Sequence, residues 1–309
     1  MSDKHIEPIR RILVGTGLTE ESVGAILTSK WLAEKLSAEL HVVHVITPIS
    51  PAAEEAIPGL TEKHLQQAEE SLEKFAGMYE IRNFAKLHVA RGQPDTEIIR
   101  LGTELNSDLL VMGRYGRGGL KHGVLGSVAD RVVRKNPTSV LIVQPEFRGP
   151  IRKLGVASAC DDAINLELER GLDLASRFGI DRIPLIMAYD VPAGYHMLSS
   201  YEEASARLAA VHQRIAADQV RLANVGFDPP VEVDIDTRLG SPGEVLPKFA
   251  EESGLDLLVI GTHSRTAVAE LILDNLSEQI VRRARCNIWA EKSPIETQTL
   301  RGFFRSLLD

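Results

Sequence analysis

The chain has few cysteines, no excess of basic charge and no long apolar run. Its two cysteines, Cys160 and Cys286, are too few for a disulfide framework or a zinc cluster, so we expect free thiols. The formal net charge is −8, so no overall basic field attracts nucleic acid, and any anion site has to be built locally. The polar start MSDKHIEPIRR has no apolar segment after it, and no run of about 18 apolar residues occurs, which favours a cytoplasmic protein that binds no membrane.

Several catalytic motifs are missing as well. The sequence has no G-x-x-x-x-G-K-[ST] phosphate loop and no G-x-S-x-G turn, which excludes a P-loop NTPase and a serine nucleophile on such a turn. The stretch GTGLTE begins like a dinucleotide-binding turn, but Glu20 stands where a glycine has to allow close helix packing. His41 and His44 are three apart in a predicted strand and therefore face opposite sides, unlike two ligands of one metal. No catalytic base or nucleophile is evident.

The composition that is present, 44% hydrophobic and 25% charged residues, is that of a globular protein of about two domains. Short apolar runs alternate with helical patterns. The first half predicts strands at 11–15, 40–46, 86–90, 108–113 and 138–143, and longer helices at 19–37, 61–79 and 127–135. The proline-punctuated stretch TPISPAAEEAIPG is predicted to be a loop. This alternation favours right-handed βαβ units and a parallel, doubly wound sheet.

The pattern then occurs a second time. IRKLGVA (151–157) restates IRRILVG (9–15), and LDLLVIG (255–261) restates SDLLVMG (107–113). Two copies of one domain are the simplest interpretation, because each copy is long enough for its own core. We therefore predict domains at 1–146 and 147–292, followed by an amphipathic tail at 293–309.

A glycine motif follows the fourth strand of the first copy. Gly113, two residues, Gly116, nine residues and Gly126-Ser127 come directly after DLLVM. This spacing resembles the nucleotide-binding signature of the universal stress protein family, and so do the GQP turn and the ending VADRVVRKNPTSVLIV. The resemblance covers nearly the whole chain. It implies two tandem flavodoxin-like (Rossmann-like) domains, each with a five-stranded parallel sheet, whose fifth strands pair with each other.

The chemistry of this loop supports a phosphate site independently. Gly113 ends a parallel strand, at the sheet edge where ligands collect beside a topological switch point. Glycines at 113, 116 and 126 allow the backbone to approach phosphate oxygens and to take positive φ angles. Gly126-Ser127 opens a helix, whose free N–H groups and positive dipole end attract anions. A surface turn with solvated basic side chains is the alternative interpretation.

One departure from the family concerns the residues that would hold the base and the ribose of a bound nucleotide. Gly17 stands where nucleotide-binding members have an aspartate near the end of the first strand, and Ala159 stands there in the second copy. The resemblance leaves the backbone near Gly15 and Val45 and the apolar edge of Met112 to hold the base. The nucleotide-binding residues we expect are Gly15, Val45, Met112, Gly113, Arg114, Gly116, Arg117, Gly126, Ser127 and Val128.

The second copy has lost most of this motif. Gly261 remains, but Ser264, Asp274 and Asn275 replace the residues that match Gly116, Gly126 and Ser127. A carboxylate at a helix start caps the helix and repels phosphate. We predict that the second domain binds no nucleotide at this position.

The resemblance implies a stress-response protein whose first domain binds ATP, ADP or AMP, with Mg²⁺, as a sensor or switch with at most slow hydrolysis. A nucleotide-free adaptor is the alternative, and an enzyme acting on another phosphorylated metabolite comes third. A homodimer and a protein partner stay open. Two segments are candidates for contact with a second chain or a protein partner. They are the aromatic loop at 189–201 and the apolar stripe of the tail, formed by Leu300, Phe303, Phe304, Leu307 and Leu308. Packing of each segment on its own chain is the simpler expectation.

Overall fold

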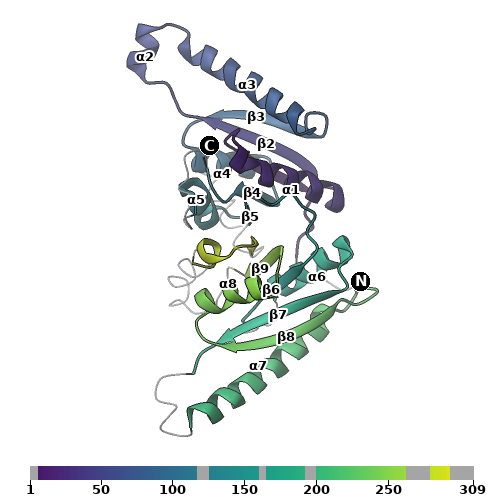
Figure 1. Ribbon diagram of the computed structural model, residues 1–309. Helices are drawn as coiled ribbons and strands as arrows, with labels where there is room; N and C mark the ends of the chain where they lie inside the picture. Colours follow the sequence, from purple (N-terminus) through teal and green to yellow (C-terminus); the bar gives the residue numbers. More distant parts are fainter. Residues whose placement is uncertain (1–5, 117–124, 160–164, 192–199, 262–278, 293–309) are drawn as a thin grey trace. The chain divides into compact units, whose positions relative to one another are not determined.

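The computed structural model describes residues 6–116, 125–159, 165–191, 200–261 and 279–292 (Figure 1). The chain divides into two compact units, one formed by Pro8–Pro150 and the other beginning at Ile151 and including Glu7. The predicted tail at 293–309 and Cys160 lie outside the described residues, whereas Cys286 is a buried thiol.

The first unit is a parallel sheet of five strands with helices packed against it. Its strands are β1 (Arg11–Thr16), β2 (Glu39–Ile46), β3 (Ala85–Arg91), β4 (Leu109–Gly113) and β5 (Ser139–Val143). Its helices are α1 (Glu20–Leu36), α2 (Pro51–Ala56), α3 (Leu60–Met78), α4 (Pro94–Glu104) and α5 (Ser127–Lys135). The strands lie in the order β3-β2-β1-β4-β5, and every pairing between them is parallel.

The central position of β1 creates a switch point in this sheet. The chain moves outward from β1 to β2 and β3, and then returns to place β4 on the other side of β1. Right-handed crossovers consequently put α1 and α3 on one face and α4 and α5 on the other. Gly15 is paired with Val43 of β2 and with Met112 of β4. The carboxyl ends of β1 and β4 are therefore the place where an open α/β sheet binds ligands.

The inner strands form because they are apolar along their whole length. The runs RILVGT, LLVMG and SVLIV are buried at nearly every position, as expected of strands covered on both faces. β3 is the edge strand, and its residues are only half-buried or exposed. The sequence located all five strands to within one or two residues, because these continuous apolar runs are bounded by polar turns.

The first two helices of this unit differ from expectation in detail. Thr19 occupies the N-cap of α1, as predicted, but its side chain makes no capping hydrogen bond. The predicted loop TPISPAAEEAIPG contains α2, so that part of the prediction was wrong. Ser50 Oγ accepts a hydrogen bond from Ala53 N at 3.2 Å, and Pro51 stands at the first helical position. Because no residue of α2 is buried, the sequence has no apolar periodicity there.

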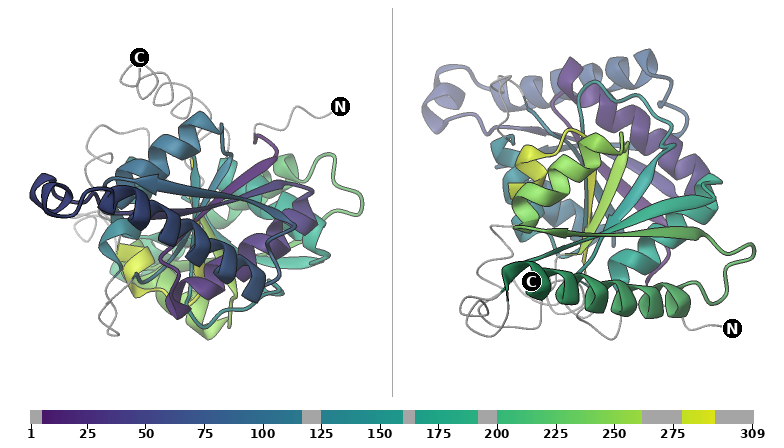
Figure 2. Two further views of the ribbon diagram at one scale, coloured as in Figure 1. Left: turned by 90° about the horizontal axis from the view of Figure 1, so that it is seen from above. Right: turned by 60° about the horizontal axis from the view of Figure 1, so that its bottom comes forward.

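The second unit repeats the topology. Its strands are β6 (Leu154–Ala157), β7 (Arg182–Tyr189), β8 (Glu232–Leu239), β9 (Leu257–Gly261) and β10 (Asn287–Glu291), in the order β8-β7-β6-β9-β10. Its helices are α6 (Leu166–Phe178), α7 (Tyr201–Ala223), which runs along β8 (Figure 2), and α8 (Pro242–Glu252). The predicted fold class, two tandem doubly wound domains with five parallel strands each, is confirmed.

Part of the aromatic loop predicted at 189–201 belongs to regular structure. Tyr189 ends β7 and Tyr201 begins α7, while residues 192–199 lie outside the described ranges. The Tyr189 hydroxyl lies 3.0 Å from Ser205 Oγ, and its ring centroid lies 5.3 Å from that of His212. Tyr189 thus packs on its own domain. No helix in the part of the chain that the structure describes is long and apolar enough to cross a membrane.

A histidine pair joins β2 and β3 of the first unit. His41 Nδ1 and His88 Nε2 are 2.8 Å apart, and the two rings stack with their centroids 5.1 Å apart. Burial lowers the pKa of both imidazoles, and for His41 the neighbouring Glu39 opposes that effect. Lys86 and Arg11 lower the pKa of Glu39 to about 2, so this carboxylate stays ionised when the histidines titrate.

We expect the first domain to lose stability as the pH falls below about 6.5, the ordinary histidine value. A lowered pKa in the folded state means that protonation is less favourable there than in the unfolded chain, so stability is complete above that pH and declines below it. Two protonated rings also leave the His41–His88 bond without an acceptor. Urea unfolding between about pH 5 and pH 8 measures this slope. The double variant His41→Gln/His88→Gln should flatten the slope, and an unchanged slope would contradict the assignment.

Candidate functional site

The candidate site lies at the carboxyl ends of β1 and β4. Gly15 of β1 lies against Met112 of β4, and a Cβ atom on Gly15 would come within 2.9 Å of Met112 Sδ and 3.0 Å of Ile98 Cδ1. Gly15 is buried and Met112 is 6% exposed. The structure therefore brings together two of the expected nucleotide-binding residues, Gly15 and Met112, and both pack close to Ile98 of α4.

The glycine loop is tied to both of its neighbours in the fold. Arg114 N donates to Val143 O of β5 at 2.8 Å, and Gly126 N donates to Arg114 O at 2.9 Å. The chain therefore leaves β4, passes Gly116 and comes back so that α5 begins beside residue 114. Residues 117–124, which include Arg117 and Lys121, lie outside the described residues.

The fold does not require glycine for the same reason at each of the three motif positions. A Cβ atom on Gly113 would lie 3.1 Å from Glu21 O, and one on Gly126 would lie 3.2 Å from Arg114 O and 3.3 Å from Gly116 N. A Cβ atom on Gly116 would meet no atom of the described residues within 4 Å. None of the three has a positive φ angle, so the expectation of left-handed glycines was wrong. Close backbone contact explains two of them, and packing does not explain Gly116.

Helix α5 begins without a side-chain cap. Gly126 occupies the N-cap with φ −60° and ψ 140°, and Asp130 N donates to its carbonyl. Ser127 is exposed and Val128 is half-buried at the first turn. The amide groups of an uncapped first turn are donors without intrahelical partners, and they add to the positive end of the helix dipole. This arrangement can hold an anion.

The side chain of Arg114 does not extend from the glycine loop into solvent, as the sequence interpretation implied. Its side chain is only 3% exposed, and its guanidinium lies 5.8 Å from the centre of the Tyr115 ring. The guanidinium is therefore buried rather than solvated.

The turn after β1 leaves room at Gly17. Thr16 Oγ1 accepts a hydrogen bond from Leu18 N at 3.0 Å and lies 2.9 Å from Ser22 Oγ. A Cβ atom on Gly17 would only touch the side chain of Thr19, at 3.7 Å or more. The position is therefore open to a side chain.

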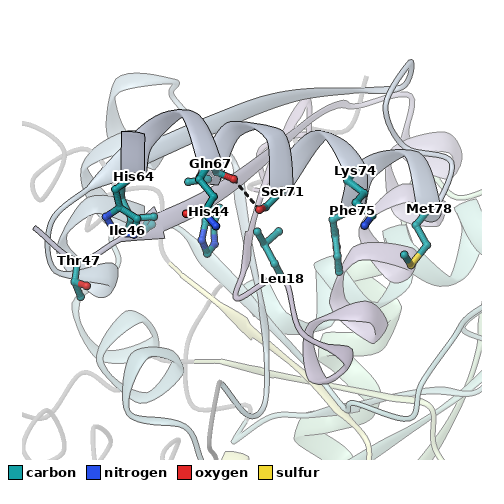
Figure 3. A pocket seen from close by; sticks show the side chains of 12 residues that line it. Leu18, His44, Ile46, Thr47, His64, Gln67, Ser71, Lys74, Phe75 and Met78 are labelled. Carbon is teal, nitrogen blue, oxygen red and sulfur yellow. Dashed lines mark hydrogen bonds between the residues drawn. The ribbon is translucent and has the colours of Figure 1, made fainter. Parts of the chain in front are cut away.

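A pocket of about 550 Å³ lies between α3 and the end of β2 (Figure 3). We call it the α3 pocket. It is lined by Leu18, His44, Val45, Ile46, Thr47, His64, Gln67, Ala68, Ser71, Lys74, Phe75 and Met78. Val45 was expected from the sequence, whereas the residues of α3 were missed. Their only signal is a spacing of three or four residues along one helix face.

The corresponding switch point of the second domain holds a carboxylate. A Cβ atom on Gly261, at the end of β9, would lie 2.8 Å from Glu167 Oε2. Glu167 also forms a hydrogen bond with Ser158, which follows β6 and lies 2.9 Å from Asn165 Oδ1. Ser264, Asp274 and Asn275 lie outside the described residues. Sequence reasoning missed Glu167, because an acidic residue in a first helical turn is ordinarily explained by the helix dipole.

Comparison with known proteins identifies the family. The sequence model of the universal stress protein family matches residues 8–144 and again residues 155–290. The chain belongs to the universal stress protein family. The predicted resemblance is therefore confirmed, and it extends over both domains.

The relatives show how far the likeness goes. The universal stress protein E homolog of Haemophilus influenzae is 25% identical over 237 residues, which cover 74% of this chain and 75% of that protein. The crystal structure of a universal stress protein from Archaeoglobus fulgidus has a TM-score of 0.64 at 22% identity, covers 92% of this chain and 98% of its own, and shares the fold. A universal stress protein crystallised in complex with cAMP matches at 17% identity with a TM-score of 0.32, which says nothing about the ligands of this chain.

Replacing Gly113 by alanine should destabilise the first domain more than replacing Gly116 by alanine does. Gly113→Ala places a methyl group against the backbone of α1 and should destabilise the first domain by about 1–3 kcal/mol. Gly116→Ala should change stability by no more than about 0.5 kcal/mol, because the fold leaves the space open. Urea unfolding of both variants measures the difference. Equal destabilisation would show that packing demands both glycines.

Proposed function

We propose that this universal stress protein binds one adenine nucleotide per chain through its first domain and acts as a sensor or switch. The observation that carries the proposal is the uncapped start of α5 at the switch point of the sheet. The loop at 114–116 is held against this helix start by the hydrogen bond from Gly126 N to Arg114 O. Gly116 adds support, because the absence of a side chain there is not required by packing.

Phosphate binding falls to the backbone and to Ser127. The exposed Ser127 hydroxyl and the amide groups of the first turn of α5 are donors for phosphate oxygens. Gly116 would allow a phosphate to approach the main chain, while Met112 and Val45 would border the base. Mg²⁺ would enter with the nucleotide, because no group of acidic, histidine or cysteine side chains within the described ranges forms a metal site.

The second domain, in this proposal, stays without nucleotide. The Glu167 carboxylate lies against Gly261 at the end of β9, in the region that corresponds to the candidate site. Phosphate brought there would meet a like charge. This supports a stoichiometry of one nucleotide per chain.

A nucleotide-free adaptor is the second candidate function. It is favoured by Gly17, since the absent carboxylate removes a ribose ligand that nucleotide-binding relatives are expected to use. Mass spectrometry of small molecules released from the freshly purified, denatured protein distinguishes the two functions. Adenine nucleotide at about one per chain supports the switch. A protein that stays empty at millimolar ATP supports the adaptor.

Gly126→Asp should abolish nucleotide binding. Aspartate caps α5 and places a negative charge at the phosphate position, which should lower affinity by more than about tenfold. Gly126→Ala is the matched control, because it brings the same Cβ atom against Arg114 O without the charge. Titration calorimetry with ATP, ADP and AMP in the presence of Mg²⁺ measures both variants. The site assignment fails if Gly126→Asp binds as tightly as Gly126→Ala.

Gly17→Asp should strengthen binding. The position has room for a side chain, and hydrogen bonds from a ribose to the new carboxylate should raise affinity by up to about tenfold. Gly17→Ala fills the same space without acceptors and should leave affinity unchanged. If both variants bind the nucleotide equally, the ribose does not lie beside residue 17.

A further inference from the structure

Helix α5, whose first turn would hold the phosphate, is too short to be stable by itself. It has 9 residues, its start has no side-chain cap, and its buried residues are Ala129, Val132 and Val133. Isolated helices shorter than about 12–15 residues are marginal in water. Contacts with neighbouring elements must therefore set the direction in which its first-turn amide groups point.

The polar side of α5 is held by one carboxylate from α4. Asp95 lies in the first turn of α4, which packs against α5 (Figure 1), and it is 4% exposed. Arg131 Nε lies 3.2 Å from Asp95 Oδ1, and Lys135 Nζ lies 3.5 Å from Asp95 Oδ2. Because Arg131 and Lys135 are four residues apart, they share one face of α5. A single buried carboxylate thus contacts α5 over a full turn.

The same turn of α4 also reaches the sheet. Ile98, three residues after Asp95, is 4% exposed, and its Cδ1 atom lies 3.0 Å from the position of a Cβ atom on Gly15. Residues three apart are neighbours on a helix surface. One turn of α4 therefore connects the Gly15–Met112 edge of the candidate site with the helix that would hold the phosphate.

The second copy of the domain lacks this ion cluster. The start of α4, QPD, is matched there by SPG, so Gly243 stands at the position of Asp95. In the same way Gln279 stands at the position of Arg131. Arg283 of that copy donates to the carbonyl oxygen of Gly243 at 3.2 Å. The buried carboxylate therefore accompanies the complete glycine motif and is replaced where that motif is incomplete.

We propose that Asp95 is a positioning residue of the nucleotide site. Its carboxylate holds Arg131 and Lys135, and so keeps α5 in the orientation in which the first-turn amide groups meet the phosphate. Asp95 acts through α5 and not by contact with the ligand. The inference rests on the proposed nucleotide binding by the first domain.

The direction of the change in Asp95→Asn tests this role. If only the charge mattered, removal of a carboxylate near a polyphosphate would strengthen binding. Loss of the anchor should instead weaken binding of Mg²⁺-ATP about tenfold. Titration calorimetry of the full chain measures the affinity, and urea unfolding identifies conditions in which each variant is folded. Asp95→Glu keeps a carboxylate on the same turn and should bind nearly as tightly as the unmodified chain.

A pair of arginine variants tests the route through α5. Arg131→Gln and Arg134→Gln each remove one positive charge from side chains that are 40% and 45% exposed, but Arg134 pairs within the helix, with Asp130 at 3.2 Å. Arg131→Gln should weaken ATP binding, and Arg134→Gln should change it by less than about twofold. The double variant Asp95→Asn/Arg131→Gln should bind no more weakly than Asp95→Asn, because both changes remove the same contact.

The outcomes separate this inference from the proposed function. Unchanged or tighter ATP binding in Asp95→Asn, or additive losses in the double variant, would overturn the positioning role while leaving the nucleotide site in place. Equal affinities of Arg131→Gln and Arg134→Gln would overturn it as well, and this comparison does not depend on the stability of Asp95→Asn. If the unmodified chain binds no ATP, the proposed function fails, and the role of Asp95 fails with it.

Discussion

The contact between residues 114–116 and the start of α5 is the constraint on which the candidate site depends. Gly126 N donates to Arg114 O, and the same glycine leaves no room for a Cβ atom beside Gly116 N. A residue with a capping side chain would satisfy the first-turn amides and force the loop away. Because glycine does neither, the feature that closes the loop also leaves the helix start open to an anion.

The two domains show that topology and charge are separate properties. Both sheets have a central first strand with a switch point beside it, so both provide the same place for a ligand. In the first domain this place is bordered by Gly15 and Met112, and in the second by the carboxylate of Glu167. The same position of the fold is thus bordered by uncharged residues in the first domain and by a carboxylate from the first turn of α6 in the second.

The sequence predicted what depends on continuous patterns and missed what depends on side-chain direction. The bounds of α5 and the five strands of the first domain follow from apolar runs and a glycine motif. The burial of Arg114 could not be predicted, because a basic residue in a glycine loop is ordinarily solvated. The α3 pocket was missed for a related reason. Ala68, Ser71 and Lys74 are common helix-surface residues, and only the placement of α3 over β2 turns them into one wall.

Two neighbouring residues in the turn after β1 differ in how strongly the backbone constrains them. Leu18 takes a φ of 56°, a left-handed conformation that is unfavourable by roughly 1–2 kcal/mol for a residue with a side chain. The bond from Leu18 N to Thr16 Oγ1 holds it there, so that its side chain lines the α3 pocket. Gly17, in contrast, has neither a positive φ nor a crowded Cβ position. The backbone therefore does not require glycine at position 17.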